Sequence, residues 1–167
     1  QKCGVYLNAA DFVNEKLAFE NDCSAKKHRI KLNDFLEKPY IEVVYKDASR
    51  LLMKNEIFGY KNCDGEVSRF VGNQHYQILN PTEQILLYER NVLPSKSQPV
   101  TEFYYFSPSA GGIVAPLTLD NVKKAFPENH KFHDLLDAEF DGNRELTQYD
   151  SHHKTFKINR LYANSLQ

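Results

Sequence analysis

The stretch IFGYKNCDGEVSRFVGNQHYQIL, from Ile57 to Leu79, decides the predicted fold. It contains three short apolar runs, separated by Asp64-Gly65 and by Gly72-Asn73. Glycine takes a positive φ at little steric cost, and Asp-Gly between apolar runs is a strong hairpin signal. Because no helical crossover separates the runs, we expect neighbouring strands to be antiparallel. The stretch therefore predicts consecutive hairpins of a meander.

Similar runs continue on both sides of this stretch. The segment YIEVVYK, Tyr40 to Lys46, is rich in the β-branched and aromatic residues that suit a pleated, half-buried surface. Further strands are predicted at residues 3–7, 29–32, 50–54, 84–90 and 101–107. We expect an antiparallel sheet of about seven or eight strands, curved into a barrel or a sandwich.

After Gly111-Gly112 the apolar spacing changes from two residues to 3.6. Thr118 suits the N-cap of a helix over residues 119–126, and a second helix is predicted over residues 129–140, with Gly142 at its C′ position. Residues 145–166 favour a third helix, although Phe156, Ile158 and Arg160 also alternate like a strand. The predicted class is α+β in a single domain, residues 1–167, with 1–116 mainly β and 117–167 mainly α.

The composition bounds the class of function. Apolar residues make up 41% of the 167 residues and charged residues 26%, as in ordinary globular proteins. Lysine plus arginine (21) nearly equal aspartate plus glutamate (22), and no basic stripe suggests a nucleic-acid partner. No apolar run approaches the ~20 residues that span a bilayer. The sequence predicts no transmembrane segment and no cofactor.

The first residue and the three cysteines point to export. The chain begins with Gln1 rather than methionine, as it would after removal of a secretory signal. Cys23 and Cys63 lie in polar segments typical of loops, whereas Cys3 belongs to the first predicted strand. We therefore predict a Cys23–Cys63 disulfide and an oxidising compartment; the alternative is three reduced, buried thiols.

Two histidines and an aspartate on the 129–140 helix are the candidate metal ligands. On a helical wheel, His130, His133, Asp134 and Asp137 share one face, opposite an apolar stripe of Phe132, Leu135, Leu136 and Phe140. Zinc sites use such histidines, but the segment lacks the glutamate of an HExxH motif. A solvated helix face is the main interpretation, and a metal or hydrolytic site at His130, His133 and Asp137 is the alternative.

Two other groups have a functional alternative. His152 and His153 follow Asp150 and Ser151, as in a nucleophile–base pair, but adjacent residues point in different directions, so polar side chains on a helix surface are the favoured interpretation. In the strand 101–107, Tyr104 and Phe106 share a face that either packs or binds a ligand.

Five segments, taken together, carry a likeness to a protein family: GVYLNAADF, KHRIKLNDF, EIFGYKNCDG, YQILNPTEQILLYE and FPENHKFHDLLDAEF. The chain resembles uncharacterised secreted proteins of Bacteroidota-type Gram-negative bacteria over nearly its full length. The resemblance implies a periplasmic or cell-surface location and brings no activity, cofactor or site residue.

Three hypotheses follow. The first is an exported, non-catalytic module that binds a protein partner or small ligand through its strand faces and loops. The second is a small metal-dependent or hydrolytic enzyme that uses the His130, His133 and Asp137 face. The third is an envelope-assembly protein that associates with itself through an exposed sheet edge.

Overall fold

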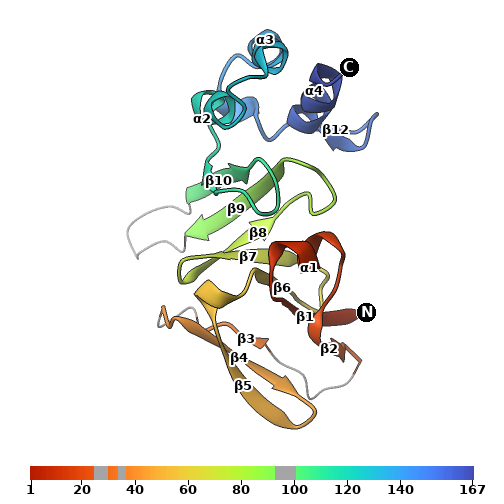
Figure 1. Cartoon of the computed structure of the whole chain (residues 1–167), viewed down its shortest axis with the longest axis vertical. Helices are drawn as coiled ribbons and strands as arrows, with labels where there is room; N and C mark the ends of the chain where they lie inside the picture. Colours follow the sequence, from red (N-terminus) through yellow and green to blue (C-terminus); the bar gives the residue numbers. More distant parts are fainter. Residues whose placement is uncertain (25–29, 34–36, 93–100) are drawn as a thin grey trace. The chain divides into compact units, whose positions relative to one another are not determined.

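The computed structural model describes residues 1–24, 30–33, 37–92 and 101–167, which form an α+β fold (Figure 1). The chain divides into two compact units, residues 1–78 and residues 79–167, which we call unit 1 and unit 2. The sequence predicts a single domain whose β part ends at residue 116. The division instead follows strand β8, so strands and helices occur together in unit 2.

Eight strands form one antiparallel sheet in the order β11-β10-β9-β8-β7-β6-β1-β2, so the predicted meander is confirmed. The sheet is open, with β11 and β2 at its edges, and the predicted closure into a barrel is wrong. The strands are β1 (Lys2–Tyr6), β2 (Ala18–Asp22), β6 (Gly59–Lys61), β7 (Val67–Val71), β8 (Gln74–Ile78), β9 (Leu86–Val92), β10 (Thr101–Ser107) and β11 (Ala115–Pro116).

Glycines set the two hairpins of the deciding stretch. Val71 pairs with Gln74 across a two-residue turn, in which Gly72 has a φ of +61°. The loop from β6 to β7 is longer than the predicted Asp64-Gly65 turn, because Lys61 pairs with Val67. Gly59 allows close pairing of these strands, since a Cβ there would lie 1.9 Å from the Ser68 carbonyl oxygen.

Unit 1 adds a second, three-stranded sheet in the order β3-β4-β5. Its strands are β3 (Ile30–Lys31), β4 (Tyr40–Tyr45) and β5 (Ala48–Met53), and the 3-10 helix η2 (Lys54–Glu56) follows them. Ile41 and Val43 of β4 share a buried core with Val5, Tyr60 and Phe70 of the larger sheet. Two sheets around one core agree with the predicted sandwich, here within unit 1. Arg29, at the start of a predicted strand, lies outside the described residues.

The N-terminal segment of unit 1 contains two elements that the sequence analysis missed, helix α1 (Ala9–Val13) and strand β2. Asn8 caps α1 by accepting the Asp11 N–H at its side-chain oxygen, at 2.8 Å. Phe12 of α1 stacks on Phe58, with ring centroids 4.8 Å apart. The short helix thereby covers one end of the unit 1 strands.

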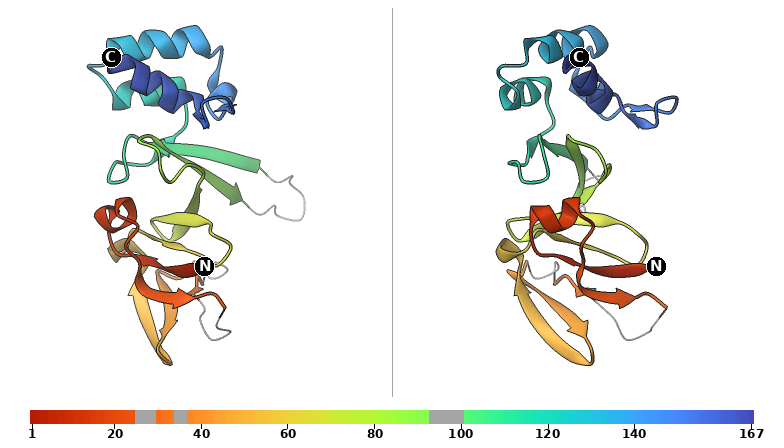
Figure 2. Two further views of the ribbon diagram at one scale, coloured as in Figure 1. Left: turned by 90° about the vertical axis from the view of Figure 1, so that its right-hand side faces the viewer. Right: turned by 45° about the vertical axis from the view of Figure 1, so that its right-hand side comes forward.

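In unit 2, three helices gather beside β9, β10 and β11 (Figure 2). They are α2 (Leu119–Ala125), α3 (His130–Glu139) and α4 (Lys157–Ser165). The predicted Thr118 cap is confirmed, because Thr118 Oγ1 accepts the Asn121 N–H at 3.1 Å. Asn129, at the predicted start of the second helix, caps α3 by accepting the Phe132 N–H at its Oδ1, at 3.0 Å. The predicted apolar stripe of α3 is also confirmed, because Phe132, Leu136 and Phe140 are buried in the unit 2 core with Leu87 and Phe106.

Two predictions about the C-terminal segment are wrong. Gly142 is extended, with a φ of −171°, so it is not a left-handed C′ residue of α3. The predicted helix over residues 145–166 begins only at Lys157. Before it come the 3-10 helix η3 (Asn143–Glu145) and the small hairpin of β12 (Tyr149–Asp150) and β13 (Thr155–Phe156). The Asp150 carboxylate accepts the N–H groups of His152 and His153, each at 3.0 Å, and so stabilises a turn instead of a helix.

A buried polar network, which we call the Asn80–Glu83–Asn159 clamp, joins α4 to the segment before β9. Asn159 Oδ1 accepts the Ile85 N–H at 2.8 Å, and its Nδ2 donates to the Ile85 carbonyl at 2.9 Å and to Glu83 Oε2 at 2.6 Å. Asn80 Nδ2 donates to the same two acceptors, each at 2.8 Å. Because these polar atoms are paired with one another, their burial costs little free energy.

None of the helices in the described part of the chain is both long enough and apolar enough to pass through a bilayer.

Candidate functional site

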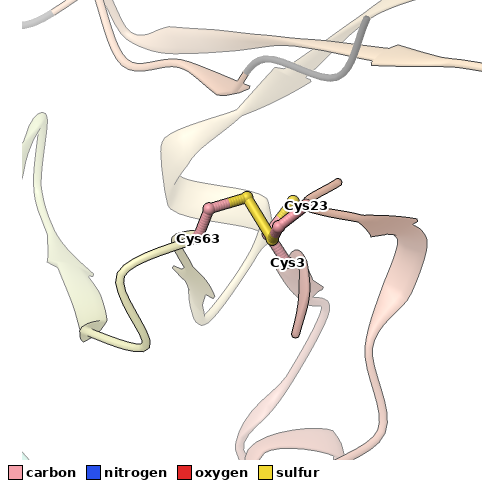
Figure 3. A group of neighbouring side chains, drawn as sticks. All are labelled: Cys3, Cys23 and Cys63. Carbon is pink, nitrogen blue, oxygen red and sulfur yellow. A yellow bond between two sulfur atoms is a disulfide. The ribbon is translucent and has the colours of Figure 1, made fainter. Parts of the chain in front are cut away.

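The three cysteines meet in unit 1 although they come from distant parts of the sequence. Cys3 lies in β1, Cys23 directly follows β2, and Cys63 lies in the loop between β6 and β7. Their sulfur atoms all lie within 4.8 Å of one another (Figure 3). Among the residues that the structure describes, this is the one group of three such metal-ligating side chains in mutual reach.

Strand pairing places two of these cysteines on one face. Cys3 pairs with Asn21 across β1 and β2, and the Cys23 N–H donates to the Gln1 carbonyl at 2.9 Å. Side chains two residues apart on a strand share a face. Cys23 is therefore the diagonal neighbour of Cys3, and the two side chains lie on the same face of the ladder.

The third cysteine is positioned by an asparagine turn. Asn62 Oδ1 accepts the N–H groups of Asp64 at 3.0 Å and Glu66 at 2.9 Å. Asparagine side chains commonly hydrogen-bond the backbone two residues further on, which closes a turn. Gly65 completes the loop with a φ of +90°. Cys63 is held in this loop with its side chain exposed.

The structure pairs Cys23 with Cys63, so the predicted disulfide is confirmed. Their Cα atoms are 5.5 Å apart, and 40 residues separate them in the sequence. Closing a loop of this length removes entropy from the unfolded chain and stabilises the folded state by about 4 kcal/mol. Since two of the three sulfurs are bonded to each other, the cluster does not offer three thiolates to a metal ion in this state.

Cys3 keeps a free thiol beside this disulfide. The side chain is buried in β1, with 5% of its surface exposed. Burial raises the pKa of the Cys3 thiol, because removal from water disfavours the charged thiolate. At neutral pH the sulfur is therefore protonated and shielded from solvent.

The predicted metal ligands of α3 have other partners. His133 Nε2 lies 2.8 Å from the Phe126 carbonyl oxygen and 3.1 Å from that of Lys123. Both oxygens are acceptors, so Nε2 carries the proton and donates to them. His133 thus caps the C-terminal end of α2, where carbonyl groups lack partners within the helix.

The other members of this predicted site do not join His133. Asp137 Oδ1 binds Lys123 Nζ at 2.5 Å, and His130 is exposed at the start of α3. The rings of His130 and His133 meet edge to face, with centroids 5.7 Å apart. These contacts tie α3 to α2, and the predicted convergence of His130, His133 and Asp137 on a metal is not present. The main interpretation of a solvated face holds for His130, Asp134 and Asp137, which are exposed, whereas His133 is half-buried.

His153 and Asp150 form a hydrogen-bonded pair, an arrangement that the sequence analysis did not favour. Asp150 Oδ2 accepts the His153 Nδ1–H at 2.8 Å and also binds the Arg160 guanidinium. The hydrogen bonds from His153 and the charge of Arg160 lower the pKa of Asp150 to about 2. The carboxylate therefore stays ionised, and it fastens the β12–β13 turn to α4.

Tyr104 and Phe106 face the core of unit 2. Phe106 has 1% of its surface exposed, and Tyr104 packs against the same cluster. The candidate role of Phe106 in ligand binding is therefore wrong, because the helices cover this face of β10. Phe103 on the opposite face is 43% exposed.

Strand β5 carries exposed apolar side chains in unit 1. Its register pairs Met53 with Tyr40, Leu51 with Glu42 and Ser49 with Val44. Because Ile41 and Val43 face the core, these six side chains form the opposite, outer face. On it, Leu51 is 64% exposed and Met53 37% exposed. Glu42 crosses the middle of the face, bound to Ser49 Oγ at 2.6 Å and to Lys31 Nζ at 3.1 Å.

The backbone of β5 adds to this surface, because β5 is an edge strand of its sheet. The Lys54 N–H donates to the Pro39 carbonyl at 2.8 Å, which makes residues 39 and 54 a hydrogen-bonded pair. Bonded and non-bonded pairs alternate along an antiparallel ladder. The N–H groups of Ser49, Leu51 and Met53 therefore point away from β4, along the same side of the sheet edge.

No family model, curated protein or solved structure matches the chain. The resemblance to secreted Bacteroidota-type proteins stays a prediction.

The sequence analysis missed the β5 surface, although its pattern was visible. The run Leu51-Leu52-Met53 places apolar residues on both faces of a strand, whereas only Leu52 is needed for the core. A strand that is apolar on both faces indicates either full burial or an exposed apolar surface.

Proposed function

We propose that this protein is an exported, non-catalytic module that binds an extended polypeptide partner along the outer face and edge of β5. The observation that carries the proposal is the exposure of Leu51 and Met53 on an edge strand, with their own N–H groups pointing away from β4. Export is supported by the Cys23–Cys63 disulfide, since such bonds persist in oxidising compartments.

Strand addition explains how this surface would bind. An incoming strand pairs its backbone with the outward N–H and C=O groups of β5, and its side chains contact the outer face. Burial of an exposed leucine side chain contributes roughly 1.5–3 kcal/mol. Glu42, between Lys31 and Ser49, supplies a polar contact that fixes the register of the partner.

The test uses a photo-crosslinking amino acid at Leu51 in the producing cells. Val13 of α1 is the matched control position, because both side chains are 64% exposed. We expect one discrete adduct with another protein from position 51 and none from position 13. Equal adducts at both positions, or none at position 51, would contradict the proposal. An adduct of twice the chain's mass would also contradict it, because it would indicate self-association through β5.

A second pair of variants tests the strand pairing itself. Ser49→Pro removes an outward N–H two residues from the crosslinker, whereas Ser49→Ala keeps that N–H and loses only the hydroxyl bond to Glu42. We expect the Ser49→Pro variant to lose the adduct and the Ser49→Ala variant to keep it, with both folded by circular dichroism. Equal adduct yields would show that the partner does not pair with the β5 backbone.

A further inference from the structure

A second property of unit 1 lies in its cysteine cluster and is independent of partner binding. We propose that Cys3 exchanges with the Cys23–Cys63 disulfide, which forms a Cys3–Cys23 bond and releases Cys63 as a modification site for external disulfides and electrophiles. The two disulfide isomers differ in which thiol is free: buried Cys3 in one and exposed Cys63 in the other.

The positions of the sulfur atoms support this exchange. Cys3 Sγ lies within 4.8 Å of both sulfurs of the disulfide, so the attacking sulfur is already close to its target. Cys3 and Cys23 lie on the same face of the paired strands β1 and β2, so the new bond would link these two neighbouring strands. Figure 3 shows the three side chains converging from separate segments.

The exchange is balanced without an oxidant or a reductant. The Cys3 thiol loses its proton, and the thiolate attacks Cys23 Sγ. The Cys3–Cys23 bond forms as the Cys23–Cys63 bond breaks, and the electron pair of the broken bond leaves on Cys63 Sγ. Cys63 then takes up a proton, so the number of disulfides and thiols is unchanged.

The direction of the exchange follows from exposure. Cys63 is exposed in the Asn62–Glu66 loop, where water stabilises the departing thiolate, whereas Cys23 is half-buried at the end of β2. A lower thiol pKa makes a better leaving group, and exposure favours the charged form. Cys63 is therefore the sulfur released, and it then stands in solvent for attack on an external disulfide or electrophile.

Peptide mapping distinguishes the three thiols. The native chain is incubated with N-ethylmaleimide, unfolded in acid to stop exchange, and digested with trypsin. Lysine and arginine positions place Cys3, Cys23 and Cys63 in separate peptides, residues 3–16, 17–26 and 62–69. We expect label to accumulate on the 62–69 peptide, at a rate that rises about tenfold per pH unit below the Cys3 pKa, since the thiolate is the nucleophile.

Two variants and one dilution series control the experiment. Cys3→Ser and Cys3→Ala keep the disulfide but lack the attacking sulfur, so label on the 62–69 peptide is expected to disappear, with circular dichroism unchanged. Exchange within one chain also requires a rate independent of protein concentration. Label confined to the 3–16 peptide, label on the 17–26 peptide, a rate that rises with concentration, or unchanged labelling in both variants would each overturn the proposal.

Discussion

Segments that are distant in the sequence are connected by a disulfide within unit 1 and by buried hydrogen bonds within unit 2. In unit 1, the Cys23–Cys63 disulfide connects the end of β2 to the β6–β7 loop. In unit 2, Asn159 of the Asn80–Glu83–Asn159 clamp connects α4 to the Ile85 backbone with hydrogen bonds of 2.8 and 2.9 Å. The covalent tie acts through the unfolded state, whereas the clamp depends on burial of its partners. We therefore expect a reductant to destabilise unit 1, and replacement of the buried Asn159 amide to destabilise unit 2.

The exposed surfaces differ as well. In unit 2, Phe106 and the apolar stripe of α3 are buried in the core. Unit 1 leaves Leu51 and Met53 on the outer face of β5. Unit 2 also exposes apolar side chains, such as Phe103. The proposed binding surface is assigned to unit 1 because Leu51 and Met53 lie together on one face of an edge strand.

The largest effect is expected from breaking the covalent tie. The double variant Cys23→Ser/Cys63→Ser should lose about 4 kcal/mol of unfolding free energy, because its unfolded chain regains the entropy of an open loop. Urea unfolding measures the loss, with Cys3→Ser, which retains the disulfide, as the control. An unchanged midpoint in the double variant would contradict the stabilising role of the disulfide.

A smaller effect is expected from breaking the clamp. Asn159→Ala should cost about 2 kcal/mol, because the Ile85 N–H and the Glu83 carboxylate lose a buried partner. Asn164→Ala is the matched control, since Asn164 lies exposed on the same helix. Equal urea midpoints for the two variants would argue against the clamp.

The smallest effect concerns the β12–β13 turn and depends on pH. The pKa of Asp150 is lowered from 3.8 to about 2, so its stabilising contribution is present above 3.8 and is lost as the pH falls through about 2. The thermal stability of the native chain should therefore exceed that of Asp150→Asn at neutral pH, and the difference should shrink in acid. A difference that stays constant down to pH 2 would show that the charge of Asp150 does not matter.

Local chemistry made much of the fold predictable. Thr118 caps α2 because its side chain satisfies a backbone N–H group nearby, and Gly72 forms a two-residue turn because it accepts a positive φ. Strand β5 begins earlier than predicted because Lys46 and Asp47 adopt positive φ, of 50° and 59°, without any glycine. A turn of this kind leaves little trace in the sequence.

The candidate sites were less predictable because they depend on contacts between elements. The spacing of His133 and Asp137 suggested a shared site, but the carbonyl of Phe126 and the ammonium of Lys123 bind them separately. The Cys23–Cys63 pairing was predicted from the polarity of its loops. The closeness of Cys3 depends on the register of β1 with β2, which the sequence analysis did not contain because it missed β2.

Hydrogen–deuterium exchange, measured with and without a dithiol reductant, tests the contrast between the two units most directly. If the disulfide stabilises unit 1 and the polar clamp stabilises unit 2, reduction should increase exchange in the described residues of 1–78, most of all in β1, β2 and β6. Exchange around Ile85 and α4 should stay unchanged. Equal increases in both units, or no increase near Cys23 and Cys63, would contradict this account.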